Sequence, residues 1–138
     1  MKSIRITIAT EPTAKGRPRT TFTSGGKFRT YTPTKTVKAE EFIRERLLRH
    51  KQDAFPAHTP VRLSITFFRT KSKYLPLREK MPFRKPDIVN FATLACDAMT
   101  KILYDDDAQI TTLNLRKRWS PTGKGYITLK MEVDNDNI

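Results

Sequence analysis

Three stretches of the chain alternate apolar and polar side chains with a period of two, and this alternation constrains the fold more than any other feature. The stretches cover residues 4–8, 61–67 and 127–133. Successive side chains of a β-strand point to opposite faces of the sheet, so each stretch predicts a strand with one buried face. A sheet of this kind needs other elements to cover its apolar face.

Two stretches with helical spacing of apolar residues can provide that cover. The first is expected to begin at Thr34 or Thr36, either of which suits an N-cap, and to end near His50. The second is expected to begin with Asp87 as its N-cap. Its apolar side chains recur at helical spacing as far as residue 102, so they should face the core.

The remaining elements follow from turn residues and prolines. Residues 20–31 predict a short hairpin around a Ser-Gly-Gly-Lys turn, and residues 110–119 predict a strand that a polar turn joins to the last one. Residues 69–86 contain three prolines and no clear period, which indicates a long loop. This order predicts a single α+β domain over residues 1–138, in which a mixed β-sheet has two helices packed on one face.

The charge balance indicates a polyanionic partner. The 138 residues include 27 Lys and Arg against 14 Asp and Glu, for a formal net charge of +13 at pH 7. Nucleic acid is therefore the first candidate partner, and an anionic membrane surface is the second.

No apolar run reaches the ~20 residues that cross a bilayer, and the first residues lack a signal core, so a cytoplasmic protein is expected. Cys96 is the only cysteine, which excludes an internal disulfide and favours a small core residue.

Two basic loops are candidates for contact with a phosphate backbone. Residues 11–19 combine two prolines and a glycine with three cations, and residues 69–86 hold seven basic residues against one acid. The prolines limit how these cations are displayed, which favours phosphate contact over a solvated turn. The candidate DNA-binding residues are Lys15, Arg17, Arg19, Lys71, Lys73, Arg84 and Lys85. Tyr74 and Phe83 either stack on bases or anchor the second loop to the core.

Acidic residues gather between residues 84 and 110 of this basic chain. Asp87 and Asp97 lie near the two ends of the predicted second helix, and three consecutive aspartates, residues 105–107, follow it. Hard divalent cations such as Mg²⁺ prefer carboxylate oxygen, so a metal site is one interpretation. A shared metal site requires the strand after the aspartates to return along the start of the helix. In the alternative interpretation, Asp87 is only a helix cap and the aspartates form only a turn.

Several short motifs follow one another in this region. They are Lys85-Pro-Asp-x-x-Asn90, Asp97-Ala-Met99 and Asp106-Asp-Ala-Gln-Ile110, preceded by Lys15-Gly-Arg-Pro-Arg19 and Tyr31-Thr-Pro-Thr-Lys35. Together they resemble the RusA family of Holliday-junction-resolving endonucleases. The resemblance runs from about Lys15 to Ile110, and the combination of motifs at this separation is more specific than any one of them.

The resemblance implies a RusA-like fold and a homodimeric, Mg²⁺-dependent endodeoxyribonuclease of phage or prophage type. Such an enzyme binds branched DNA and resolves four-way junctions by paired symmetric nicks, in DNA recombination and repair. It acts in the cytoplasm of a bacterial or phage-infected cell, without a membrane and without a small-molecule cofactor. Carried onto this chain, Asp87 and Asp107 are the metal-binding and catalytic aspartates, and Asp106 is a third catalytic candidate beside Asp107.

Two positions depart from the family pattern. Val89 stands where the family has its second aspartate, and Thr93 stands where it has a lysine. Valine has no oxygen for a metal, and single losses of preorganised charge stabilisation cost about 10²–10³ in rate. Asp97 lies ten residues beyond Asp87 on the helix, which we expect to be too far for compensation. The alternative function is therefore a weakened or inactive RusA-like protein that binds branched DNA.

A third function class follows from composition alone. A small, strongly basic chain is also typical of RNA-binding proteins of the ribosomal type. The chain contains no RNP-like aromatic run, so this class ranks last.

Overall fold

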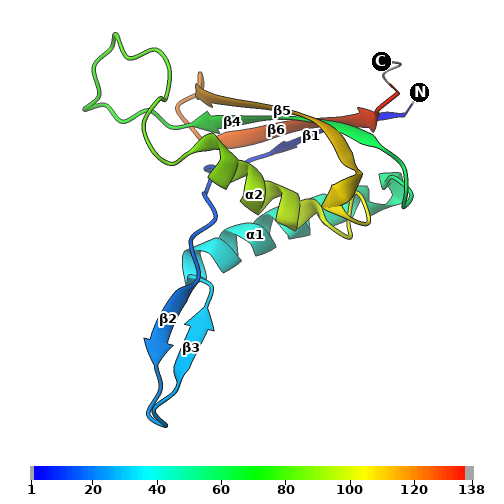
Figure 1. The fold of residues 1–138 in the computed structure, drawn as a ribbon. Helices are drawn as coiled ribbons and strands as arrows, with labels where there is room; N and C mark the ends of the chain where they lie inside the picture. The colour runs from blue at the N-terminus through cyan, green and yellow to red at the C-terminus, as the bar shows by residue number, and fades with distance from the viewer. Residues whose placement is uncertain (1, 136–138) are drawn as a thin grey trace.

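The computed structural model describes residues 2–135 and shows a four-stranded sheet with two helices on one face and a separate hairpin (Figure 1). The strands are β1 (Ser3–Ile8), β2 (Arg19–Phe22), β3 (Phe28–Tyr31), β4 (Val61–Arg69), β5 (Ile110–Trp119) and β6 (Tyr126–Val133). The helices are α1 (Thr34–Leu47) and α2 (Ile88–Met99), with the short 3₁₀ segments η1 (Leu48–Asp53) and η2 (Asp107–Gln109). The predicted α+β class with a mixed sheet is confirmed.

The sheet has the order β1-β6-β4-β5. Strand β4 pairs antiparallel with β6 and parallel with β5. The expectation that the turn after residue 119 joins two paired strands is wrong, because β4 lies between β5 and β6. Burial explains this order: β4 and β6 each bury one side chain in two, whereas no residue of β5 is fully buried. The strand with the least apolar surface to cover takes the edge.

The core lies between the sheet and the two helices. The alternating residues of β4 are buried, as their period of two predicts. The ring of Phe67 on β4 stacks on the ring of Phe91 on α2, with 5.4 Å between the ring centroids. Ala95 and Ala98 are also buried on this face of α2, and such small side chains let the helix approach the sheet closely. The apolar face predicted for α2 is therefore the buried one.

Both helix starts differ in detail from the prediction. Helix α1 begins at Thr34, but Pro33 holds its N-cap position and makes no side-chain cap. Asp87 does occupy the N-cap position of α2 with an extended backbone, yet its carboxylate forms no capping hydrogen bond. The Asp87 side chain is therefore not used by the helix start. Within residues 2–135 no helix has the length and apolar character needed to cross a bilayer.

Candidate active site

One face of α2 and the start of β5 line a pocket at the edge of the sheet. Val89, Thr93 and Asp97 follow one another at intervals of four residues, which places them on the same side of the helix. Asp107 lines the same pocket from η2, the segment that leads into β5. The other lining residues are Ala92, Cys96, Ile110, Leu113 and Leu115. The two substituted positions of the predicted site and its last aspartate thus meet in one pocket.

The two neighbouring carboxylates Asp106 and Asp107 have different electrostatic environments. The carboxylate of Asp106 accepts a hydrogen bond from the backbone N–H of Ala108 at 3.2 Å, which lowers its pKa. A hydrogen bond with Asp106 raises the pKa of Asp107, and burial and the negative charges of Asp106 and Asp97 raise it further. Asp107 therefore binds a proton more readily than an ordinary aspartate, and a cation in the pocket would relieve the same repulsion.

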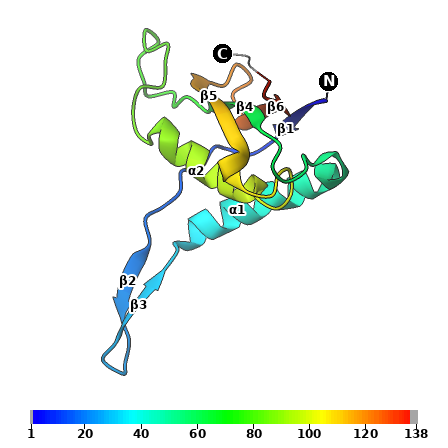
Figure 2. The ribbon, with the colours of Figure 1, turned by 45° about the vertical axis from the view of Figure 1, so that its right-hand side comes forward.

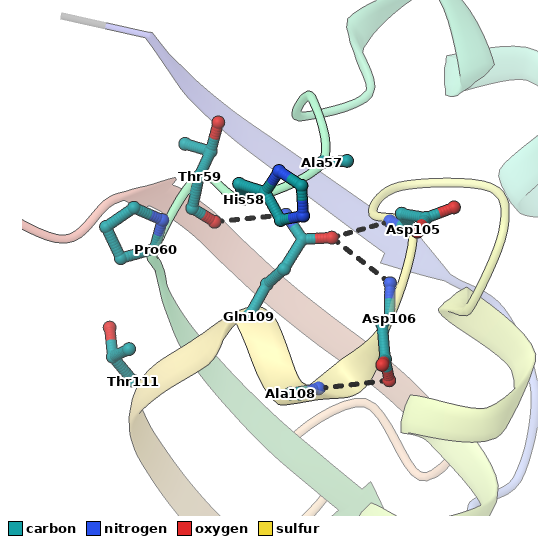
Figure 3. Close-up of a pocket in the computed structure, with 9 residues that line it drawn as sticks. All are labelled: Ala57, His58, Thr59, Pro60, Asp105, Asp106, Ala108, Gln109 and Thr111. Atoms are coloured by element: carbon teal, nitrogen blue, oxygen red, sulfur yellow. Dashed lines mark hydrogen bonds between the residues drawn. The ribbon is translucent and has the colours of Figure 1, made fainter.

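Gln109 holds the aspartate turn in place, a role that sequence reasoning missed (Figure 3). Its Oε1 accepts hydrogen bonds from the backbone N–H groups of Asp105 (2.9 Å) and Asp106 (3.1 Å). Its Nε2 donates to the backbone carbonyls of Pro56 (2.9 Å) and Thr59 (3.0 Å). Gln109 is buried, and with Asp106 it forms a capping box. The spacing of an Asp three residues before a Gln was the available signal.

Asp87 lies at the opposite end of α2 from Asp97, ten residues or about 15 Å along the helix axis. It acts electrostatically on Lys117, whose Nζ donates to the carbonyls of Arg84 and Pro86 at 2.9 Å each. Burial lowers the pKa of Lys117, and the charge of Asp87 opposes this effect. The neighbourhood of Asp87 is therefore already partly neutralised by an ammonium group.

The metal-binding pair of Asp87 and Asp107 stays a prediction. The charged groups that act on Asp107 are Asp106 and Asp97, and its carboxylate also has a backbone hydrogen bond from Ala108. Across residues 2–135, no group of three or more His, Cys, Asp or Glu side chains is placed to hold a metal ion. Two carboxylates, those of Asp97 and Asp107, do line one pocket. One or two carboxylates completed by waters and phosphate are enough for Mg²⁺.

Lys15 reaches this region from a distant part of the chain. Its Nζ forms an ion pair with the carboxylate of Asp97, and this contact raises the pKa of Lys15. Its backbone N–H also donates to the carbonyl of Asn90 at 3.0 Å. Asp97 in turn is held by Arg44, whose Nη2 donates to the Asp97 carbonyl at 2.7 Å. Lys15 therefore places an ammonium group one helical turn from Thr93, the position at which a lysine was expected.

The chain is similar to known proteins over most of its length. The family model described as "Endodeoxyribonuclease RusA" matches residues 9–130. The chain belongs to the RusA family. It is also similar to "Uncharacterized protein YqaN" of Bacillus subtilis (strain 168), with 26% identity over 130 residues that cover 87% of this chain and 90% of the relative. The predicted family is confirmed, and DNA is the polyanion that a RusA-family endodeoxyribonuclease acts on.

Besides Lys15, which pairs with Asp97, the basic residues expected to bind DNA in this RusA-family chain divide into two groups. Lys71 and Arg84 organise their own loop around the buried Glu79: Arg84 Nε donates to its carboxylate at 2.8 Å, and Lys71 Nζ donates to its carbonyl at 2.8 Å. Trp119 Nε1 also donates to that carbonyl, at 3.0 Å. The remaining cations on exposed residues are Arg17, Arg19, Lys73 and Lys85. This second group is free of the Glu79 network, and its contact with DNA stays a prediction.

The aromatic residues of the same loop do not anchor it to the core. Tyr74 is 86% exposed and Phe83 is 73% exposed, so that part of the prediction is wrong. The Glu79 network replaces apolar anchoring.

Cys96 is half-buried in the pocket, and burial raises the pKa of its thiol to about 11. A thiol with this pKa is protonated near neutral pH, which disfavours Cys96 as a nucleophile.

Proposed function

We propose that this protein is a structure-specific endodeoxyribonuclease that binds four-way DNA junctions and resolves them by paired symmetric nicks. We further propose that it works as a Mg²⁺-dependent homodimer in DNA recombination and repair. The observation that carries the proposal is the pocket in which Asp107 meets the α2 face formed by Val89, Thr93 and Asp97. Family membership supplies the reaction class, and the net charge of +13 suits a DNA substrate.

We assign Asp107 as the residue that holds the metal, with either Asp97 or Asp87 as its partner. The raised pKa of Asp107 supports this role, because a site that disfavours a lone negative charge gains from a bound cation. Asp97 is favoured over Asp87 because it lines the same pocket as Asp107. A Mg²⁺ ion held there would polarise the scissile phosphate and lower the pKa of an attacking water.

The chain's own residues have separate roles in this proposal. Asp106 and Gln109 fix the backbone that presents Asp107. Lys15 neutralises Asp97 until a metal ion competes for the Asp97 carboxylate or a phosphate competes for the Lys15 ammonium group. The exposed cations Arg17 and Lys85 hold the DNA backbone, with contacts that are independent of sequence and weakened by salt.

A second candidate function is a weakened or inactive member of the family that binds branched DNA. Val89 is 63% exposed in the pocket and offers no oxygen. The Thr93 hydroxyl donates to the Val89 carbonyl at 2.9 Å, so it is engaged within the helix. Neither side chain replaces the carboxylate or the ammonium group that the family pattern has at these positions.

A titration with Mg²⁺ separates the two candidates. The wild-type chain is incubated with an end-labelled four-way junction and with a linear duplex of the same sequence. The nuclease predicts metal-dependent, paired nicks in the junction and an intact duplex. Binding of the junction without cleavage at any Mg²⁺ concentration would establish the second candidate. Equal affinity for the junction and for single-stranded RNA would refute both.

A further inference from the structure

The β2–β3 hairpin extends away from the sheet and the helices in both views of the molecule (Figures 1 and 2). Its strands pair in antiparallel register from Arg19 with Tyr31 to Phe22 with Phe28. All eight strand residues are exposed. A two-stranded hairpin without a packed face is marginally stable in water, so this one is suited to gain its cover from a partner.

The tip of the hairpin is nevertheless well organised. Thr23 N–H donates to the Lys27 carbonyl at 2.7 Å, and Lys27 N–H donates to the Thr23 hydroxyl at 3.2 Å. Gly26 completes the turn with φ of 76°, a conformation that glycine adopts without strain. Directly behind the turn, the rings of Phe22 and Phe28 form an edge-to-face pair with centroids 5.3 Å apart.

This aromatic pair is open to solvent. Phe22 is 64% exposed and Phe28 is 76% exposed, whereas apolar side chains of this size usually find cover. The cations Arg19, Lys27 and Arg29 lie on the same hairpin, and residues 19–31 contain no acid. The hairpin therefore presents two aromatic rings within a purely positive segment.

The charge of this segment selects among the possible partners. Residues 19–31 carry three cations and no acid, so this segment favours a polyanion over the basic surface of a second copy, and the proposed homodimer is expected to use another face. DNA provides partners for both the cations and the aromatic rings of the hairpin. Phosphates pair with the cations, and every base has a face on which an aromatic ring can stack. Stacking needs bases that are not enclosed in a continuous duplex, and a branch point provides them.

We propose that the β2–β3 hairpin is a DNA-binding arm that reaches the branch point, where Phe22 and Phe28 stack on exposed bases and Lys27 and Arg29 contact phosphates. This inference deepens the proposed function and rests on it for the identity of the substrate. It adds a contact remote from the pocket of Asp107, so the arm acts in substrate selection and not in the chemical step.

The test compares Phe22→Ala/Phe28→Ala with the control Leu77→Ala, which removes an apolar side chain that is 87% exposed on another loop. Fluorescence anisotropy without Mg²⁺ measures the affinity for a four-way junction, a linear duplex and a single strand. Stacking on one base corresponds to about fivefold to 150-fold in affinity, so the double variant should lose at least about tenfold on the junction. Its affinity for the duplex should change by less than about threefold, and Leu77→Ala should resemble wild type on every substrate.

An equal loss on junction and duplex, or no loss on the junction, would overturn the proposal. A fall in molecular mass by light scattering would instead assign the hairpin to a contact between copies of the chain. If wild type binds junction and duplex equally well, the proposed function fails. The affinity for the single strand then tests whether the hairpin binds bases. An unchanged affinity of the double variant for that strand would end the proposal, and a loss of about tenfold would sustain it.

Discussion

Asp106 and Asp107 are adjacent in sequence, yet the structure moves their pKa values in opposite directions. The pKa of Asp106 falls chiefly because Asp106 accepts a backbone hydrogen bond from Ala108, whereas the pKa of Asp107 rises because of its hydrogen bond with Asp106, its burial and the negative charges of Asp106 and Asp97. A raised pKa means that Asp107 loses its charge at a higher pH than an ordinary aspartate as the solution is acidified. Any function that needs the Asp107 carboxylate is therefore lost early on the acid side.

Asp106→Asn tests this electrostatic coupling. Asparagine keeps a side-chain oxygen for the cap but removes the neighbouring charge, so the pKa of Asp107 should fall. The acid limb of metal-dependent cleavage should then shift to lower pH, by up to about one unit. Carboxyl ¹³C NMR measures the pKa of Asp107 itself, without an activity assay. Asp105→Asn is the control, and a shift of equal size in that variant would contradict the assignment.

The α2 face of the pocket offers a test by restoration. Val89→Asp together with Thr93→Lys returns to this chain the two groups that the family pattern has there. If their absence limits catalysis, the double variant should cut a four-way junction at least about 10²-fold faster than wild type. The measurement is the single-turnover rate at saturating Mg²⁺. An unchanged rate would show that another residue already supplies the charges that Val89 and Thr93 lack, and Asp97 and Lys15 are the first candidates.

At the scale of elements, α2 both builds the core and carries the site. Its buried face includes Phe91 against Phe67, and its open face lines the pocket. Phe91→Ala should destabilise the fold by about 3–5 kcal/mol, because it leaves a cavity between the helix and the sheet. Urea unfolding measures this loss. Phe83→Ala, which truncates a ring that is 73% exposed, should stay within about 0.5 kcal/mol of wild type. Similar losses in both variants would refute this account of the core.

The elements themselves could be predicted because each depends on a local period. The alternation in β4 and the helical spacing in α2 identify their type and their buried faces without further information. The order of strands could not be predicted, since a six-residue turn after Trp119 does not determine whether β5 and β6 are neighbours. Side-chain burial decides that question in favour of β4 between them.

The site could be predicted only in part. The spacing of motifs identified Asp107 and the substituted positions Val89 and Thr93, which do line one pocket. The ion pair between Lys15 and Asp97 joins residues 82 positions apart, and no local pattern shows such a contact. The same limit applies to the contacts of Gln109 with Pro56 and Thr59, which precede it by 53 and 50 residues.

At the scale of the whole molecule, the exposed aromatic side chains and the acidic pocket have separate locations. Among residues 2–135, the hairpin and the loop of residues 70–86 present the exposed aromatic side chains together with several exposed cations, while Asp97 and Asp107 meet at the far end of α2 from Asp87. A basic chain with a small acidic pocket suits a nuclease, because exposed cations bind phosphates and the pocket binds a cation. This arrangement is the basis of the central claim that the pocket of Asp107 is the catalytic centre.

The most direct test of that claim is the cleavage of a labelled four-way junction by Asp107→Asn beside Asp105→Asn. The Val89→Asp/Thr93→Lys background is used if wild type cuts too slowly to measure. The account predicts that Asp107→Asn loses at least about 10²-fold in rate and binds the junction as tightly as its parent or more tightly, since a negative charge near phosphate is gone. Asp105→Asn should keep the parental rate. Cleavage by Asp107→Asn at the parental rate would contradict the account.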